Sequence, residues 1–154
     1  MKTAIIYYSA HHGNTKKLLD VIAEHVDVTL IEATGNAQAD LSGYDLIGFA
    51  SGIYYSKFHA SVLQFAENNL PQDKKVFIIY TRGAKRKGYT NAIEQIIKTK
   101  GAQMLGVYEC PGFDTFGPLK LIGGIAKGRP NEEDINGAVE FYNEIIGAIT
   151  VKQG

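Results

Sequence analysis

Four absences narrow what this chain of 154 residues can be. Its single cysteine, Cys110, leaves no pair for a disulfide and no all-cysteine metal cluster within one chain. Its 16 Lys and Arg balance 16 Asp and Glu, so no overall field attracts nucleic acid or an anionic membrane. No apolar run approaches the roughly 18–20 residues that a membrane span needs. Met1-Lys2 leads straight into a strand-like run, so we expect no signal peptide.

The remaining composition is that of an ordinary globular protein. Apolar residues make up 45% and charged residues 21% of the chain. The length suits one domain that spans residues 1–154. A lone cysteine is consistent with a reducing compartment. We therefore expect a cytoplasmic protein, monomeric or weakly dimeric, without a metal site.

Short apolar runs alternate with segments in which apolar residues recur at helical spacing. The runs predict strands at 3–8, 27–33, 45–51, 75–81 and 103–110. The periodic segments predict helices from Asn14 to about His25, at 59–69, at 90–100 and from Pro130 onward. The run 27–33 alternates like an edge strand, and the others read as buried strands.

Strands separated by helices predict a parallel sheet with right-handed crossovers and helices on both faces. Five such strands suit an α/β, doubly wound sheet whose strand order reverses beside the first strand. Ligands of such sheets bind beyond the carboxyl ends of the strands, at the point of reversal. The loop after the first strand is therefore the first place to look for a site.

That loop is "SAHHGNT", residues 9–15, and it leads directly into the first helix. Unpaired N–H groups and the positive end of the helix dipole face it, and the Ser9 and Thr15 hydroxyls are further donors. Gly13 permits close approach of the backbone, so the loop can cradle a phosphate. Its spacing is neither the Walker nor the GxGxxG type. The alternative is that Asn14 or Thr15 only caps the helix while the two histidines are exposed.

The stretch "IIYYSAHHGNT", residues 5–15, resembles the flavodoxin signature. That signature has two apolar residues, an aromatic, any residue, Ser or Thr, three residues, Gly, any residue and Thr. Leu19 departs from the alanine that the family usually carries. The likeness covers nearly the whole chain. It implies a three-layer flavodoxin-like sandwich with strand order 2-1-3-4-5, and FMN as the cofactor whose phosphate the loop binds.

The resemblance also implies which residues hold FMN. Around the phosphate they are Ser9, His11, His12, Gly13, Asn14 and Thr15. In the loops after the third and fourth strands they are Ser51, Gly52, Ile53, Tyr54, Tyr55, Thr81, Arg82, Gly83 and Tyr89. Tyr54 or Tyr55 is expected to stack on the flavin ring; the alternative is that the aromatic residues of this loop cover the helix beneath.

The loop after the fourth strand, "TRGAKRKGY", is strongly basic. Many flavodoxins are acidic around this edge of the flavin, and Arg82, Lys85, Arg86 and Lys87 reverse that sign. A cation close to the ring would favour the reduced, more negative cofactor and raise its potential. Exposed Lys and Arg side chains otherwise only solvate a turn. Arg82, which lies nearest the strand end, is the strongest candidate for a cation close to the flavin ring.

Segment 111–130 is long for a connection in a compact domain. A lid, a partner surface and a substrate wall are all consistent with it. Phe113 and Phe116 would flank the ring or fill the core. Cys110 is expected to be a buried strand residue without a redox role.

Three functions follow from these readings. The first is an FMN-dependent electron carrier that shuttles electrons between a reductase and an acceptor protein, with no catalytic residues. The second is a small FMN oxidoreductase acting on a quinone- or porphyrinogen-type substrate, because "GIYYSKFHASVLQF" resembles flavodoxin-type protoporphyrinogen oxidases. The shorter, mixed 111–130 segment weakens that likeness. The third is a binding module that has lost the cofactor, against which the intact "SAHHGNT" argues.

Overall fold

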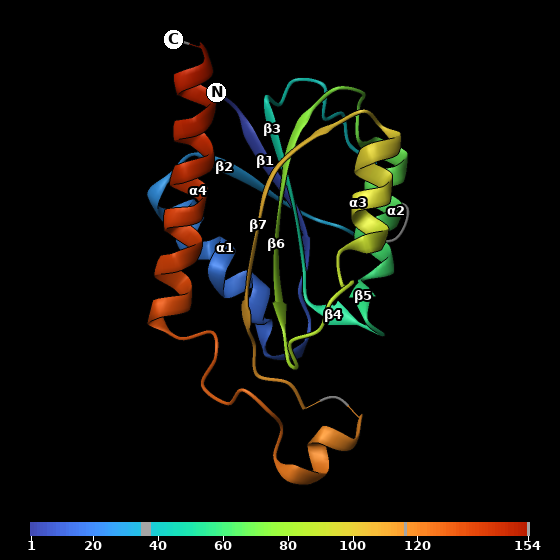
Figure 1. The fold of residues 1–154 in the computed structure, drawn as a ribbon, viewed down its shortest axis with the longest axis vertical. Coiled ribbons are helices and arrows are strands. Elements are labelled where there is room, and N and C mark those ends of the chain that lie inside the picture. Colours follow the sequence, from blue (N-terminus) through green and yellow to red (C-terminus); the bar gives the residue numbers. More distant parts are fainter. Residues whose placement is uncertain (35–37, 116, 154) are drawn as a thin grey trace.

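The computed structural model describes residues 1–34, 38–115 and 117–153, and its centre is a five-stranded parallel sheet (Figure 1). Across the sheet the strands are β2 (Val28–Glu32), β1 (Thr3–Tyr8), β3 (Leu46–Ser51), β6 (Lys75–Arg82) and β7 (Gln103–Pro111). Because β6 and β7 are the fourth and fifth strands of this sheet in chain order, the predicted order 2-1-3-4-5 is confirmed.

Two pairs of helices cover the two faces of the sheet. The pair α1 (Asn14–His25) and α4 (Glu132–Gln153) packs on one face, and α2 (Ala60–Asn69) and α3 (Asn91–Thr99) pack on the other (Figure 1). The predicted three-layer α/β sandwich is thereby confirmed. Within the described part of the chain, no helix has the length and apolar character to cross a membrane.

Side chains of the inner strands alternate between the two helical layers. On β1, Ala4 and Ile6 join the core under α2 and α3, whereas Ile5 and Tyr7 join the core under α1 and α4. A strand buried on both faces needs apolar residues at every position. This double burial explains why the inner strands read as continuous apolar runs.

The prediction of a buried strand at 103–110 is wrong in one respect. Within the part of the chain that the structure describes, strand β7 pairs only with β6 and forms the second edge of the sheet. Most of its residues are only partly buried, and Gln103 and Val107 are exposed. Its apolar residues suggested a buried strand, but an edge strand with no further pairing among the described residues is less fully covered than the inner strands.

Three short elements were not predicted. A hairpin of β4 (Ile53–Tyr54) and β5 (Lys57–Phe58) follows β3. Short 3-10 helices η1 (His11–Gly13) and η2 (Gly117–Ile122) lie in the loops after β1 and β7. All three lie at the carboxyl end of the sheet, so the departures from a regular fold concentrate where a site is expected.

Gly48 in the middle of β3 provides room for an aromatic core residue on the neighbouring strand. A Cβ at this position would lie 2.4 Å from Cζ of Phe77. We expect Gly48→Ala to lower the free energy of unfolding by about 1–3 kcal/mol, because the buried ring must shift. Gly147→Ala, at an exposed helical site with open space around it, should raise it by up to ~1 kcal/mol. Urea unfolding measures both, and an unchanged midpoint for Gly48→Ala would contradict the packing.

Candidate functional site

The carboxyl ends of the parallel strands meet at one edge of the sheet, at the lower end of Figure 1. The chain leaves β1 toward β2 on one side, while β3 lies on the other side of β1. The strand order therefore reverses between β1 and β3, which is where doubly wound sheets bind ligands. Four loops gather there, following β1, β3, β6 and β7.

The loop after β1 turns sharply into α1. His12 and Gly13 both have left-handed backbones, with φ of 62° and 65°, and Gly13 at the N-cap offers no side chain to the helix. The Ser9 hydroxyl accepts a hydrogen bond from the Lys16 N–H at 3.2 Å. The side-chain cap is therefore Ser9 rather than Asn14 or Thr15. Helix geometry leaves the remaining N–H groups of the first turn for a ligand.

Asn14 and Thr15 open α1 with buried side chains. The Asn14 Nδ2 group donates to the Phe113 carbonyl at 2.9 Å, while its Oδ1 atom is buried and has no hydrogen-bond partner among the described residues. The Thr15 hydroxyl lies 2.8 Å from the hydroxyl of Thr81 at the end of β6. A buried acceptor without a donor costs free energy, so Asn14 Oδ1 is suited to a ligand hydroxyl or N–H.

The β4–β5 hairpin forms the wall beside β3. Its two-residue turn places Tyr55 and Ser56 at φ of 51° and 64°, the type I′ pattern that glycine or asparagine normally adopts. The Tyr54 hydroxyl accepts a hydrogen bond from the Ala10 N–H at 3.1 Å, which joins the hairpin to the loop after β1. Burial raises the pKa of Tyr54. The side chain of Tyr55 is 83% exposed at the open side.

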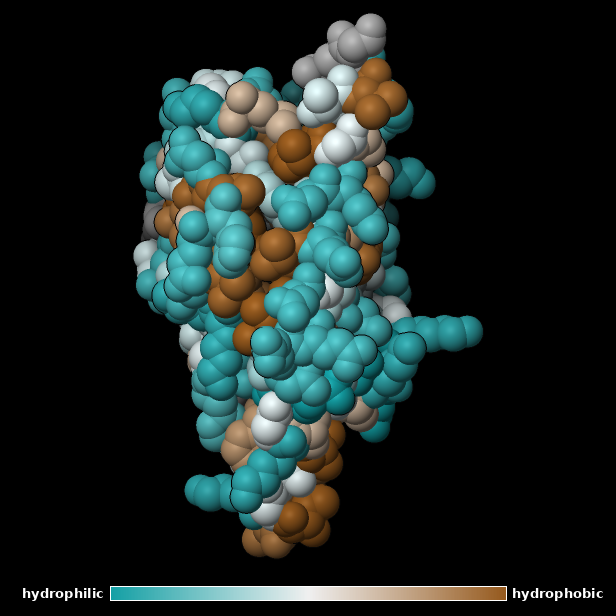
Figure 2. All heavy atoms as spheres, turned by 90° about the vertical axis from the view of Figure 1, so that its left-hand side faces the viewer, coloured by the Kyte–Doolittle hydropathy of each residue, from teal (hydrophilic) through white to brown (hydrophobic). Residues whose placement is uncertain are grey.

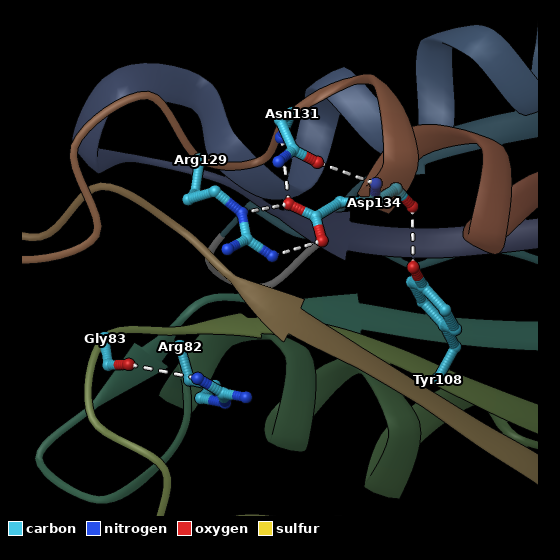
Figure 3. Close-up of polar contacts among 6 residues, drawn as sticks. All are labelled: Arg82, Gly83, Tyr108, Arg129, Asn131 and Asp134. Atoms are coloured by element: carbon cyan, nitrogen blue, oxygen red, sulfur yellow. Dashed lines mark hydrogen bonds and ion pairs between the residues drawn. The ribbon is translucent and has the colours of Figure 1, made fainter.

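At the end of β6, the predicted ring cation is already engaged by a carboxylate. The Arg82 Nε atom lies 2.6 Å from Glu109 Oε2. Its Nη1 donates to the Gly83 carbonyl at 3.3 Å (Figure 3). Lys85 lies 4.0 Å from the other oxygen of the same carboxylate. The charge of Arg82 is thus offset by Glu109, although Arg82 still lines the cleft.

Residues 112–130, here called the strap, form the wall beside the loop after β1. The backbones of Asp114 and Ile125 pair through hydrogen bonds of 2.9 and 2.8 Å, which close the strap into a loop. The Phe113 ring packs against His12 with centroids 4.4 Å apart. Gly83 allows the strap to approach, because a Cβ there would lie 2.5 Å from Asp114 Oδ2. Phe116 lies outside the described residues.

The far end of the strap is fixed to α4 by an ion pair (Figure 3). Arg129 donates from Nε and Nη2 to the two carboxylate oxygens of Asp134, each at 2.6 Å. Asn131 N–H donates to the same carboxylate, and the Tyr108 hydroxyl donates to the Asp134 carbonyl at 2.6 Å. Arg129 holds the pKa of Asp134 below its usual range. Desolvation raises the pKa of the neighbouring Cys110 thiol to about 12, so this cysteine stays protonated.

Together these loops enclose a cleft. Its lining consists of Ala10, Asn14, Thr15, Gly52, Ile53, Tyr54, Tyr55, Thr81, Arg82, Gly83, Gly112, Phe113 and Asp114. Most of the predicted ring-side residues are therefore brought together. Ala10, Gly112 and Asp114 were missed, and the position of Gly112 and Asp114 just beyond a strand end was the signal that could have found them.

Two of the predicted ring-side residues, Ser51 and Tyr89, are not among the residues that line the cleft. The Ser51 hydroxyl donates to the Gly52 carbonyl at 2.6 Å and accepts from the His59 N–H at 3.1 Å. The buried Tyr89 donates its hydroxyl to the Ala84 carbonyl at 2.9 Å. Each holds its own loop in shape, so a role in direct binding is not supported by their placement.

The residues that were predicted to surround a phosphate fall into two groups. Asn14 and Thr15 line the cleft itself, whereas Ser9 and Gly13 shape the entry into α1. His11 lies in η1. His12 Nε2 lies 3.2 Å from the Thr115 hydroxyl in the strap.

A doubly wound five-stranded sheet with its cleft between the first and third strands is the architecture of flavodoxin-like proteins. The sequence matches the Flavodoxin domain family over residues 5–109. The chain belongs to that family.

The chain also resembles another protein in sequence and solved structures in fold. The chain is 37% identical over 148 residues to an uncharacterized protein of Methanocaldococcus jannaschii, covering 95% of this chain and 99% of that protein. It superposes on oxidised flavodoxin 2 of Bacillus cereus with a TM-score of 0.68, 20% identity, and coverage of 96% and 99%. A flavoprotein of Lactobacillus acidophilus in complex with FMN gives a TM-score of 0.53, 19% identity, and coverage of 70% and 92%.

The cleft has features that suit FMN. The open first turn of α1 suits a phosphate, and the unpaired Asn14 Oδ1 suits a hydroxyl or N–H donor. The enclosed space is about 80 Å³, well below the roughly 300–1,000 Å³ of pockets that bury a whole small molecule. A flat ring would therefore lie along the open side of the cleft, beside Tyr55.

The ion pair of the strap gives a prediction for acid stability. Because the folded-state pKa of Asp134 is lowered, its contribution is present above the unfolded pKa of about 3.9 and is lost as the pH falls through the folded value. We expect Asp134→Asn to lower the melting temperature by a few degrees at pH 7, and the gap to wild type to close below about pH 4. Asp20→Asn, which breaks the exposed pair with Lys16, is the matched control and should have little effect. A gap that persists unchanged at pH 3 contradicts the assignment.

Proposed function

We propose that this protein is an FMN-dependent electron carrier that passes electrons between a reductase and an acceptor protein. The observation that carries the proposal is the mouth of α1, where uncapped N–H groups, the unpaired Asn14 Oδ1 and the Thr15–Thr81 hydroxyl pair meet at the point of strand reversal. Family membership supports the same reading. Bound FMN would supply the ability to accept and release one or two electrons.

The chain's own residues would divide the work of holding FMN. The first turn of α1 would bind the phosphate through backbone N–H groups, with Thr15 close by. Asn14 would accept a hydrogen bond through Oδ1. Tyr54 and Tyr55 would contact the flat ring, with Tyr54 held in place by Ala10 and Tyr55 at the open side.

An open cleft suits a carrier, because a partner must approach the ring edge closely. Electron transfer through such an edge needs no catalytic acid or base from the protein. The competing oxidoreductase would turn over a small substrate by itself. Rapid oxidation of NAD(P)H or reduction of a quinone by the isolated chain would favour that enzyme, and cytochrome reduction only after addition of a reductase would favour the carrier.

The phosphate site can be tested by comparing FMN with riboflavin, which lacks the phosphate. We expect Ser9→Asp to weaken FMN binding by about 10- to 100-fold, roughly 1.4–2.7 kcal/mol, because it places a negative charge beside the phosphate. Riboflavin affinity should stay within about twofold. The new carboxylate can still accept from the Lys16 N–H, so α1 keeps its cap. Quenching of flavin fluorescence measures both affinities.

Two results would count against the proposal. Failure of the wild-type chain to bind FMN would refute it outright. Equal loss of FMN and riboflavin affinity in Ser9→Asp would show that the phosphate does not bind at the mouth of α1.

The Arg82–Glu109 pair predicts opposite shifts of the cofactor's potential. Removing the cation in Arg82→Gln leaves Glu109 unopposed and should lower the two-electron midpoint potential. Removing the carboxylate in Glu109→Gln frees the cation and should raise it. Each shift should be on the order of tens of millivolts, since a charge interaction of about 1–2 kcal/mol corresponds to ~20–45 mV for two electrons. Potentiometric titration of the loaded protein measures both, and shifts of the same sign would contradict the predicted role of Arg82.

A further inference from the structure

Charge is divided unevenly between the two ends of the molecule. The four loops beyond the strand ends, taken as residues 9–15, 52–59, 82–90 and 112–130, contain eight Lys or Arg and one Asp. Their formal charge is therefore +7, and because the whole chain is neutral, the remaining residues carry −7. The zero net charge by itself predicts no attraction for a charged partner. The separation of the charges nevertheless gives the molecule one strongly positive end.

Two of the eight cations form close ion pairs within the structure, and the exposed Lys85 lies at the longer distance of 4.0 Å from Glu109. Arg82 pairs with Glu109, and Arg129 pairs with Asp134. The other six have exposed side chains and are called here the basic rim. Its members are Lys57, Lys85, Arg86, Lys87, Lys120 and Lys127. They come from the hairpin, the loop after β6 and the strap, which are the three segments that form the open side of the cleft.

Few carboxylates offset this rim. Asp114 lines the cleft itself, and Glu109 is engaged by Arg82. Glu132 and Glu133 follow the strap in the chain, but they line a separate hollow beside Tyr108 and the start of α4. The positive potential at the mouth of the cleft therefore extends into solvent.

Two large apolar side chains are exposed in the strap. Leu121 is 89% and Ile122 is 71% exposed, in and at the end of η2. Figure 2 shows apolar side chains on the part of the molecule that projects below the sheet and helices. Apolar contacts together with charged side chains are what a protein interface requires.

We propose that the basic rim docks the acidic face of a redox partner protein over the open side of the cleft. This inference rests on the proposed electron-transfer function. A ring of like charges around the cleft steers and orients an oppositely charged partner, which brings the partner's redox centre to the ring edge. An anionic bilayer would also attract these cations. Binding to a flat bilayer, however, does not require that the cations lie around three sides of a cleft.

A matched pair of probes tests the sign of this surface. Native cytochrome c is basic, whereas exhaustively succinylated cytochrome c is acidic and carries the same haem. We expect the FMN-loaded, oxidised protein to bind the ferric succinylated form at least about tenfold more tightly than the native form at low ionic strength. Raising the salt to about 0.15 M should remove most of this difference. Calorimetry measures both affinities without electron transfer.

Variants at opposite ends of the molecule locate the surface. The triple variant Lys85→Gln, Arg86→Gln and Lys87→Gln should weaken binding of the succinylated probe about tenfold or more. The control Lys2→Gln, Lys98→Gln and Lys152→Gln removes the same charge from exposed positions outside the four loops and should change it less than about twofold. Equal losses in the two variants, or tighter binding of native cytochrome c, would overturn the proposal.

Two further measurements separate the alternatives. FMN content is read from flavin absorbance, so a chain that binds no FMN but still prefers the acidic probe would refute the carrier while leaving the basic surface standing. Vesicles of phosphatidylserine and phosphatidylcholine test the bilayer. Vesicle binding that is tighter than binding of the succinylated probe, and is lost in Leu121→Ser with Ile122→Ser, would overturn the proposal in favour of a membrane surface.

Discussion

Register across the parallel sheet is the constraint on which the cleft depends. The buried hydroxyls of Thr15 and Thr81 lie 2.8 Å apart, joining the first turn of α1 to the end of β6. This contact exists because alternate residues of β6 face the α1 layer, as Phe77 and Ile79 do. A slip of one residue would turn Thr81 to the opposite face. The alternation that buries the core therefore also positions the polar floor of the cleft.

The strap and the loop after β1 form a single polar and aromatic unit. Asn14 donates to the Phe113 carbonyl, and the Phe113 ring packs on His12. Gly112 must lack a side chain, since a Cβ there would lie 2.7 Å from Asn14 Nδ2. Of the three roles open for the segment, a wall of the cleft is the one that these contacts support directly. Through Arg129 and Asp134, the same wall is anchored to α4.

The sequence was most informative where periodicity alone decides structure. Apolar runs and helical spacing predicted every strand and helix of the sandwich, and the signature around Gly13 drew attention to one of the loops that line the cleft. The hairpin escaped prediction because its turn uses Tyr55 and Ser56 at positive φ, where the usual signal is glycine or asparagine. Ser51 and Tyr89, by contrast, do not line the cleft. Their hydroxyls satisfy carbonyls of their own loops, and no sequence pattern distinguishes such a bond from contact with a ligand.

The charge distribution has a physical cost that bears on function. Exposed cations gathered at one end of a neutral chain repel one another, whereas spreading them among the 15 acidic residues outside the four loops would relieve that repulsion. Ion pairs with carboxylates do form at this end of the molecule, as those of Arg82 and Arg129 show. In contrast, Lys57, Lys120 and Lys127 have no carboxylate of their own loop beside them in sequence. An acidic partner surface over the cleft would relieve the repulsion. The clustered cations would therefore favour partner binding at the mouth of the cleft while they lower the stability of the free chain. Such a trade-off is expected where function shapes a surface.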